Sequence, residues 1–82
     1  MKDSLYNGNH NISGERIRIA RERKGLSQVQ LAAKLQTDGL TFTNNSVSQV
    51  ERNQRHLRDF ELKHIAKHLD VSADWILGEG NL

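Results

Sequence analysis

A run of amide and hydroxyl side chains, rich in hydrogen-bond donors and acceptors, occupies the stretch TNNSVSQVERN from Thr43 to Asn53. Val47 and Val50 are three residues apart in this stretch, which places them on one face of a helix. The remaining side chains are polar; Asn44 projects from the first turn, and the other side carries Asn45, Ser48, Gln49 and Arg52. Asn and Gln can bind adenine through N6 and N7, and Ser and Thr can reach phosphates. This helix is therefore a candidate for entering the DNA major groove.

A second amphipathic helix precedes the polar one. Ser27 and Gln30 form a capping-box pattern, S-x-x-Q, that predicts a helix start at Ser27. Its apolar face is predicted to hold Leu31 and Leu35, with Val29 and Ala32 beside them. Backbone amides in its first turn, next to Gln28, provide a site for a DNA phosphate because the positive end of the helix dipole lies there.

Basic side chains gather in two segments, although the net charge is only +2. The first segment runs from Arg16 to Lys24 and contains five cationic side chains with Glu22 among them. The second follows the polar helix directly and contains Arg52, Arg55 and Arg58. Charge runs are usually solvated faces, so these clusters support a nucleic-acid partner without establishing one.

Evidence for catalysis or metal binding is slight. His64 and His68 share a helical face, but no neighbouring carboxylate or thiol completes a metal site, so we expect no metal and treat both as solvent-facing. The chain has no nucleophile elbow, no phosphate-binding Gly-rich loop, no H-E-x-x-H motif and no EF-hand loop. We therefore expect no enzymatic activity and no cofactor.

Helix signals recur along the chain and predict an all-α fold of five short helices. Ser13 is the expected cap of the first helix, and Gly25 is expected to stop it. Thr43 caps the third helix, which runs to about Arg52, and Asn53 can adopt the left-handed conformation that ends it.

Two further helices follow. Asp59 is the expected cap of the fourth, whose apolar stripe is Leu62, Ile65, Ala66 and Leu69. Ser72 caps a last short helix over residues 73–77, stopped by Gly78, and Trp75 is expected to anchor the core.

Size and composition allow one domain. The chain has 82 residues, of which 35% are hydrophobic, so any core must be small. Residues 1–11 are polar and without period, and we interpret them as a flexible leader to a domain over residues 12–82. The absence of cysteine excludes disulfides, and no apolar run is long enough for a membrane span or a signal peptide. We expect a soluble, cytoplasmic protein.

Three segments carry a family resemblance: LSQVQLAAKL, TNNSVSQVERNQR and LKHIAKHLDVSADWIL. In order and spacing they resemble the helix-turn-helix domain of Cro- and CI-type phage repressors and of the xenobiotic-response-element family of bacterial regulators. The resemblance covers Ile12 to Gly78 and implies the lambda-repressor-like fold, with the second and third helices forming the helix-turn-helix. The sequence departs from the family in a longer turn, QTDGLTFT, and in Asn53 and Asp70, where glycine is common.

The resemblance also implies roles for individual residues. Base reading falls to Asn44, Asn45, Ser48 and Gln49, and DNA-backbone contacts fall to Gln28, Thr43, Ser46, Arg52, Asn53 and Arg55. Arg21 and Glu51 match the family's structural ion pair, which answers the need of Arg21, on the half-buried side of its helix, for an acidic partner.

These observations favour a sequence-specific, double-stranded DNA-binding transcriptional regulator, and a repressor in particular. We expect a homodimer on a palindromic operator, with Ile76 and Leu77 as dimer contacts. Two other classes remain open: a protein-interaction module, such as an antitoxin or antirepressor subunit, and a metal-dependent enzyme built on the two histidines. The sequence does not specify the operator, an effector, the regulated genes or the shape of the long turn.

Overall fold

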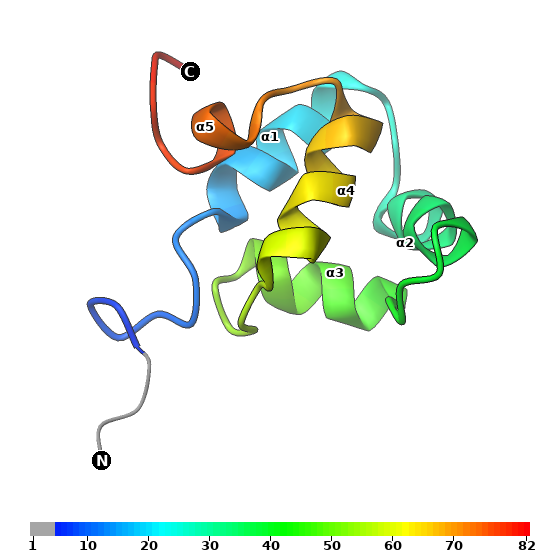
Figure 1. The fold of residues 1–82 in the computed structure, drawn as a ribbon, viewed down its shortest axis with the longest axis horizontal. Coiled ribbons are helices and arrows are strands. Elements are labelled where there is room, and N and C mark those ends of the chain that lie inside the picture. The colour runs from blue at the N-terminus through cyan, green and yellow to red at the C-terminus, as the bar shows by residue number, and fades with distance from the viewer. Residues whose placement is uncertain (1–4) are drawn as a thin grey trace.

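Five helices separated by short connections build the fold, as the sequence predicts (Figure 1). The computed structural model describes residues 5–82, so the predicted leader lies partly outside the described residues. The helices are α1 (Gly14–Arg23), α2 (Gln28–Thr37), α3 (Asn44–Glu51), α4 (Asp59–Leu69) and α5 (Ala73–Ile76). Within residues 5–82 the only β-type pairing is one isolated bridge between Tyr6 and Asn9. The all-α class is confirmed.

Three helices start where the sequence signals place them. The Ser27 hydroxyl accepts a hydrogen bond from the Gln30 amide at 3.0 Å, and the Gln30 side chain accepts one from the Ser27 amide at 2.8 Å. The Ser72 hydroxyl likewise accepts from the Trp75 amide at 3.0 Å. Thr43 caps α3 in the same way. Local capping chemistry therefore determines these starts.

Ser13 is at the predicted N-cap position of α1 but does not cap it with its side chain, and the predicted cap at Asp59 is wrong. Ser13 precedes α1, but its backbone is already helical (φ −98°, ψ −8°) and its side chain makes no capping hydrogen bond. Asp59 is the first residue of α4 rather than its cap, and Glu61 instead accepts a hydrogen bond from the Arg58 amide at 2.9 Å. In both places a residue from another position satisfies the helix start.

The left-handed residues predicted at helix ends are present. Gly25 has φ +72°, and Asn53 and Asp70 have φ +60° and +57°. Asn tolerates this region better than most residues, and Asp does so at some cost. Both positions where the family commonly has glycine therefore keep the expected turn.

The core lies where all five helices meet. Its buried apolar residues are Ile17, Ala20, Leu31, Ala32, Leu35, Phe42, Val47, Val50, Ile65, Ala66, Leu69 and Ile76. Trp75 is half-buried and packs against the edge of this cluster. Val29 is 61% exposed, so its predicted inward position is wrong. It lies two residues before Leu31, which is roughly 200° around the helix from the buried stripe.

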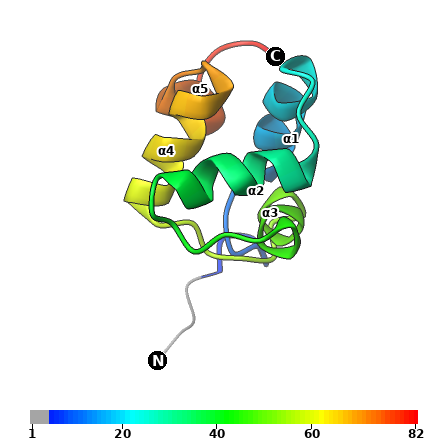
Figure 2. The ribbon, with the colours of Figure 1, turned by 90° about the vertical axis from the view of Figure 1, so that its right-hand side faces the viewer.

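Figures 1 and 2 show α3 along one edge of the molecule, with α2 crossing beside it and α1, α4 and α5 behind. The α2–α3 turn leaves the end of α2 next to α4 and runs back to the start of α3 (Figure 2). Phe42 in this turn is buried, and Gly39 has φ +88°. Among the described helices none is both long and apolar enough to cross a membrane.

Candidate nucleic-acid interface

The outward face of α3 carries polar side chains that make no hydrogen bond within residues 5–82. Asn44 and Asn45 are exposed, and Ser48 and Gln49 are half-buried. Val47 and Val50 point the other way, into the core. The helix therefore presents two amides in its first turn, with a hydroxyl and a third amide in the next.

Thr43 and Ser46 close the start of α3. The Thr43 hydroxyl accepts from the Ser46 amide at 3.1 Å, and the Ser46 hydroxyl accepts from the Thr43 amide at 3.3 Å. The two hydroxyl oxygens are 3.1 Å apart. Both groups predicted to contact DNA backbone thus also form the capping box of α3.

Behind α3, Arg21 and Glu51 pair as the sequence implied. Arg21 Nε donates to Glu51 Oε2 at 2.6 Å, and its Nη2 donates to Oε1 at 3.1 Å. Hydrogen bonding to Glu51 outweighs burial and raises the pKa of Arg21 above its usual value. The Gln28 side chain also donates to Glu51 Oε1, at 3.0 Å. These contacts fix the end of α3 to α1 and to the start of α2, and they occupy the Gln28 amide donor.

Asn53 and Asn11 lock the loop after α3 against the start of α1. Asn53 Oδ1 accepts from the Gly14 amide at 2.9 Å. Asn11 Oδ1 accepts from the Ser13 amide at 2.7 Å, and its Nδ2 donates to the carbonyl of Arg55 at 2.8 Å. Asn11 is the last residue of the predicted leader, and these hydrogen bonds join it to the predicted domain. Asn11 and Gly14 were not predicted from the sequence, since their partners lie about 40 residues away in the chain and no local pattern marks either residue.

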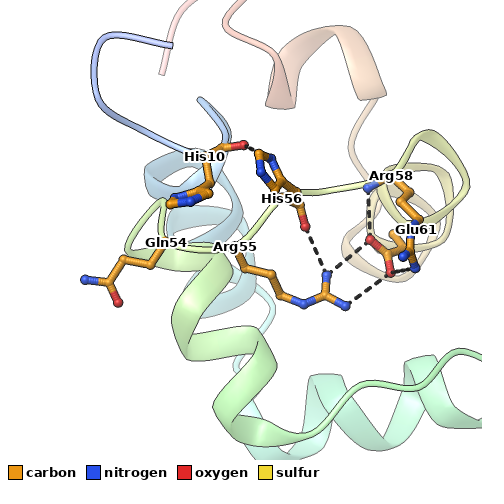
Figure 3. A pocket seen from close by; sticks show the side chains of 6 residues that line it. All are labelled: His10, Gln54, Arg55, His56, Arg58 and Glu61. Carbon is orange, nitrogen blue, oxygen red and sulfur yellow. Dashed lines mark hydrogen bonds and ion pairs between the residues drawn. The ribbon is translucent and has the colours of Figure 1, made fainter. Parts of the chain in front are cut away.

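Arg55 does not extend toward solvent. Its guanidinium donates to both carboxylate oxygens of Glu61, at 3.1 and 3.3 Å, and lies 4.4 Å from the Phe42 ring centroid. Figure 3 shows this pair in the open hollow between the α3–α4 loop and α4, whose lining residues are His10, Gln54, Arg55, His56, Arg58 and Glu61. The sequence placed Arg55 on DNA phosphate; in the fold its two Nη groups donate to Glu61, and Nη1 also donates to the His56 carbonyl at 3.2 Å.

Two other arginines near the end of α3 remain available. The exposed Arg52 makes no side-chain hydrogen bond or ion pair within residues 5–82. Arg58 is 70% exposed and approaches Glu61 only at 3.8 Å. Gln54, which lies between Asn53 and Arg55 in the loop that the resemblance matches to the family's phosphate-binding loop, is also exposed. Arg52 and Arg58 are therefore exposed cationic groups of the α3–α4 connection, and of these two only Arg52 has no ion pair within residues 5–82.

The prediction that His64 and His68 face solvent is wrong. Both are half-buried, and His64 Nδ1 and His68 Nε2 lie 2.9 and 2.7 Å from one oxygen of Asp38. These two hydrogen bonds, and a weaker contribution from Lys67, lower the pKa of Asp38 to about 2. The carboxylate belongs to the α2–α3 turn, 26 residues before His64 in the chain. No local sequence pattern could therefore predict this contact. No group of three His, Cys, Asp or Glu side chains that could hold a metal occurs in residues 5–82.

One of the two predicted dimer contacts is excluded. Ile76 is 0% exposed and belongs to the core, because it points back from α5 onto α1 and α4. Leu77 is 44% exposed. Of the two residues, only Leu77 is available to another molecule.

Comparison with known proteins agrees with this geometry. A family model described as helix-turn-helix matches residues 17–76, which is most of the chain. The chain therefore belongs to the helix-turn-helix family, and its fold is that of the phage-repressor type of DNA-binding domain. A search of curated proteins found no match.

Among solved structures, the chain is similar to the P22 c2 repressor protein, which was determined in complex with synthetic operator 9T in the presence of Tl+. The TM-score is 0.71 and the sequence identity is 27%, over 85% of this chain and 98% of that chain. The two therefore share the arrangement of the helix-turn-helix.

Proposed function

We propose that this protein is a sequence-specific, double-stranded DNA-binding transcriptional repressor that reads the major groove with α3. The observation that carries the proposal is the outward face of α3, where the side chains of Asn44, Asn45, Ser48 and Gln49 have no hydrogen-bond partner within residues 5–82. Amides and hydroxyls projecting from one side of a narrow helix match the donor and acceptor pattern of base edges. The P22 c2 repressor, which has the same fold, was determined with a synthetic operator, and this supports the same class of partner here.

Backbone contacts in this proposal come from the elements around α3. The start of α2 beside Gln28 offers helix-terminal amides, and Thr43 and Ser46 lie at the start of α3. Arg52 supplies positive charge at the other end of α3, together with the loop at Asn53, and Arg58 supplies it at the start of α4. Because Arg55 is held by Glu61, we assign its phosphate role to these two arginines.

A domain with one short reading helix makes few base contacts, so we propose that two copies bind a palindromic operator. The half-sites would then be about one helical turn, roughly 34 Å, apart. The homodimer is expected to form through exposed groups near α5, such as Leu77.

The experiment is selection of bound sites from a random duplex pool, followed by salt-titrated binding to the selected and scrambled duplexes. We expect Gln49→Ala or Asn45→Ala to weaken binding to the selected duplex by about 1–3 kcal/mol and to relax choice at one base pair. Equal losses on the selected and scrambled duplexes would contradict base reading by α3. Salt-insensitive binding to a protein with no duplex binding would instead indicate a protein-interaction module.

A further inference from the structure

The two ends of α3 are attached to the fold in different ways. Its C-terminal end is fixed directly, through Glu51 to Arg21 and through Asn53 to Gly14. Its N-terminal end follows the α2–α3 turn, and within residues 5–82 the side chains of Thr43 and Ser46 make hydrogen bonds only within this pair of residues. Val47 is buried in the core and α3 packs on α2, so the first turn of α3 is held by this packing and by the α2–α3 turn that leads into it. The direction in which Asn44 and Asn45 point therefore depends in part on how the turn is held.

Within the turn, the backbone first closes the end of α2. The Gly39 amide donates to the Gln36 carbonyl at 2.9 Å, and the Leu40 amide donates to the Leu35 carbonyl at 3.1 Å. The Gln36 side chain then donates to the Phe42 carbonyl, and the Phe42 ring is buried in the core. These contacts hold the turn to α2 and to the core, but none of them ties the start of the turn to α4.

Asp38 provides that tie. One carboxylate oxygen accepts hydrogen bonds from His64 Nδ1 and His68 Nε2 and lies 3.4 Å from Lys67 Nζ. The three donors come from successive positions on one face of α4, whereas Asp38 directly follows α2. We call the group of Asp38, His64 and His68 the turn clasp. Because the Asp38 side chain is only 15% exposed, these bonds are partly shielded from water.

The clasp ties the turn to a rigid part of the molecule. Ile65, Ala66 and Leu69 on the neighbouring positions of α4 are buried in the core, against α1 and α5 as well as α2. α4 therefore offers a fixed reference that is independent of the outward face of α3. Its contacts with Asp38 restrain the start of the turn that delivers α3.

We propose that Asp38, held by His64 and His68, is a positioning residue that sets how the first turn of α3 is presented to DNA. This inference rests on the proposed function, because it concerns the accuracy with which that surface reads bases. It predicts an uneven effect. Loss of the clasp should relax base choice at the pairs read by Asn44 and Asn45, while the pair read by Gln49, nearer the fixed end, keeps its preference.

The test uses the full chain with Asp38→Ala, which removes the acceptor. Site selection from a random duplex pool, well below each variant's unfolding midpoint, gives the base preference at every position. We expect preference to fall by about fivefold or more at the Asn44 and Asn45 positions, which single-residue substitutions of those asparagines identify. The salt dependence should be unchanged, since no phosphate contact is removed. Hydrogen exchange at the Leu40 amide should quicken in the same variant.

Two further variants separate positioning from general stability. Asp38→Asn keeps an oxygen that can accept from both imidazole N–H groups, so it should restore most of the base preference. Ser72→Ala removes the α5 cap, far from the turn, and should lower stability while leaving base choice intact. If Asp38→Ala does not fold, His68→Ala removes one donor and carries the same expectation.

The outcomes are distinguishable. Unchanged base choice in Asp38→Ala, or an equal relaxation in Ser72→Ala, would overturn the positioning role. Uniform relaxation that includes the Gln49 position would also overturn it, because the fixed end of α3 would then depend on the clasp. If the wild-type chain itself selects no sequence, the proposed function has failed instead.

Discussion

The two sides of α3 carry polar residues in opposite situations. On the inner side, Glu51 is bonded to Arg21 and Gln28. On the outer side, Asn44, Asn45 and Gln49 carry amide groups with no partner in residues 5–82. Buried side-chain nitrogen and oxygen atoms in the described residues all have a hydrogen-bond partner. Unpartnered polar groups are thus confined to places where another molecule can meet them.

This difference separates structural residues from recognition residues without reference to residue type. A polar side chain that is bonded inside the fold contributes to stability, and its loss leaves a buried group unsatisfied. A polar side chain with no intramolecular partner contributes little to stability. Substitutions on the inner side should therefore change the free energy of unfolding, and substitutions on the outer side should change DNA binding alone.

The largest effect is expected from Glu51→Ala. The substitution leaves the Arg21 guanidinium, whose side chain is 10% exposed, without its carboxylate partner. Removal of one partner of a buried ion pair typically costs about 3–5 kcal/mol. Urea denaturation would measure this loss. Glu22→Ala is the matched control, since Glu22 also approaches Arg21, at 4.0 Å, but is 55% exposed. A similar loss for both variants would contradict the distinction between the two carboxylates.

Gly14→Ala should have the next largest effect. A Cβ atom at this position would lie 2.4 Å from the carbonyl oxygen of Glu51 and 2.7 Å from that of Val50. Both are backbone atoms, so α1 and the end of α3 must separate, at a cost of about 1–3 kcal/mol. Denaturation of Gly14→Ala beside Glu15→Ala, a change at the exposed neighbouring position, gives the comparison. A midpoint equal to that of the wild type would show that the close approach does not constrain the fold.

Arg55→Ala and Arg52→Ala should likewise differ in their effect on the free energy of unfolding. Arg55 satisfies the carboxylate of Glu61, whose side chain is 4% exposed, so its removal should lower stability by about 1–3 kcal/mol. Arg52 has no side-chain hydrogen bond or ion pair in the described residues, and its removal should change stability by less than about 0.5 kcal/mol.

DNA binding should respond in the opposite order. Arg52→Ala should weaken binding to selected and scrambled duplexes alike and reduce the salt slope by roughly 1. Denaturation and salt-titrated binding of both variants measure the two effects. A flattened salt slope in Arg55→Ala with unchanged stability would show that Arg55 contacts a DNA phosphate, contrary to this prediction.

Much of the fold could be predicted because its signals are local. The capping boxes at Ser27 and Thr43 and the left-handed Asn53 each depend on residues within one turn of the chain. Helical spacing likewise identified Leu31, Leu35, Val47 and Val50 as core residues. Local patterns misled at the caps of α1 and α4, and at Val29, where an apolar side chain faces water.

What could not be predicted depends on contacts between residues far apart in the chain. Asp38 meets the two histidines of α4 across 26 and 30 residues, and the side chain of Asn53 reaches Gly14 across 39. Arg55 and Glu61 are six residues apart, but only the bend of the α3–α4 loop brings them together. Without such contacts, Arg55 resembled a phosphate ligand and the histidines resembled surface residues. The shared outward face of Asn44, Asn45, Ser48 and Gln49 was easier to predict, because one short helix contains all four residues.

The smallest effect should be a pH dependence in the turn clasp. Hydrogen bonds from His64 and His68 hold the pKa of Asp38 near 2, below its usual value of 3.8. Since the folded-state pKa is lowered, the clasp's stabilising contribution is complete above about pH 4 and is lost as the pH falls toward 2.

Denaturation midpoints between pH 6 and pH 2 would measure it. Asp38→Asn should lose less stability than the wild type over this range, because its amide does not titrate. Asn45→Ala, on the outer side of α3, should follow the wild-type curve, and Asp70, whose pKa is lowered by Lys24, contributes equally in all three proteins. Parallel curves for Asp38→Asn and the wild type would show that ionisation of Asp38 adds nothing to the free energy of folding. The turn would then be held by Phe42, by the Gln36 side chain and by its backbone hydrogen bonds.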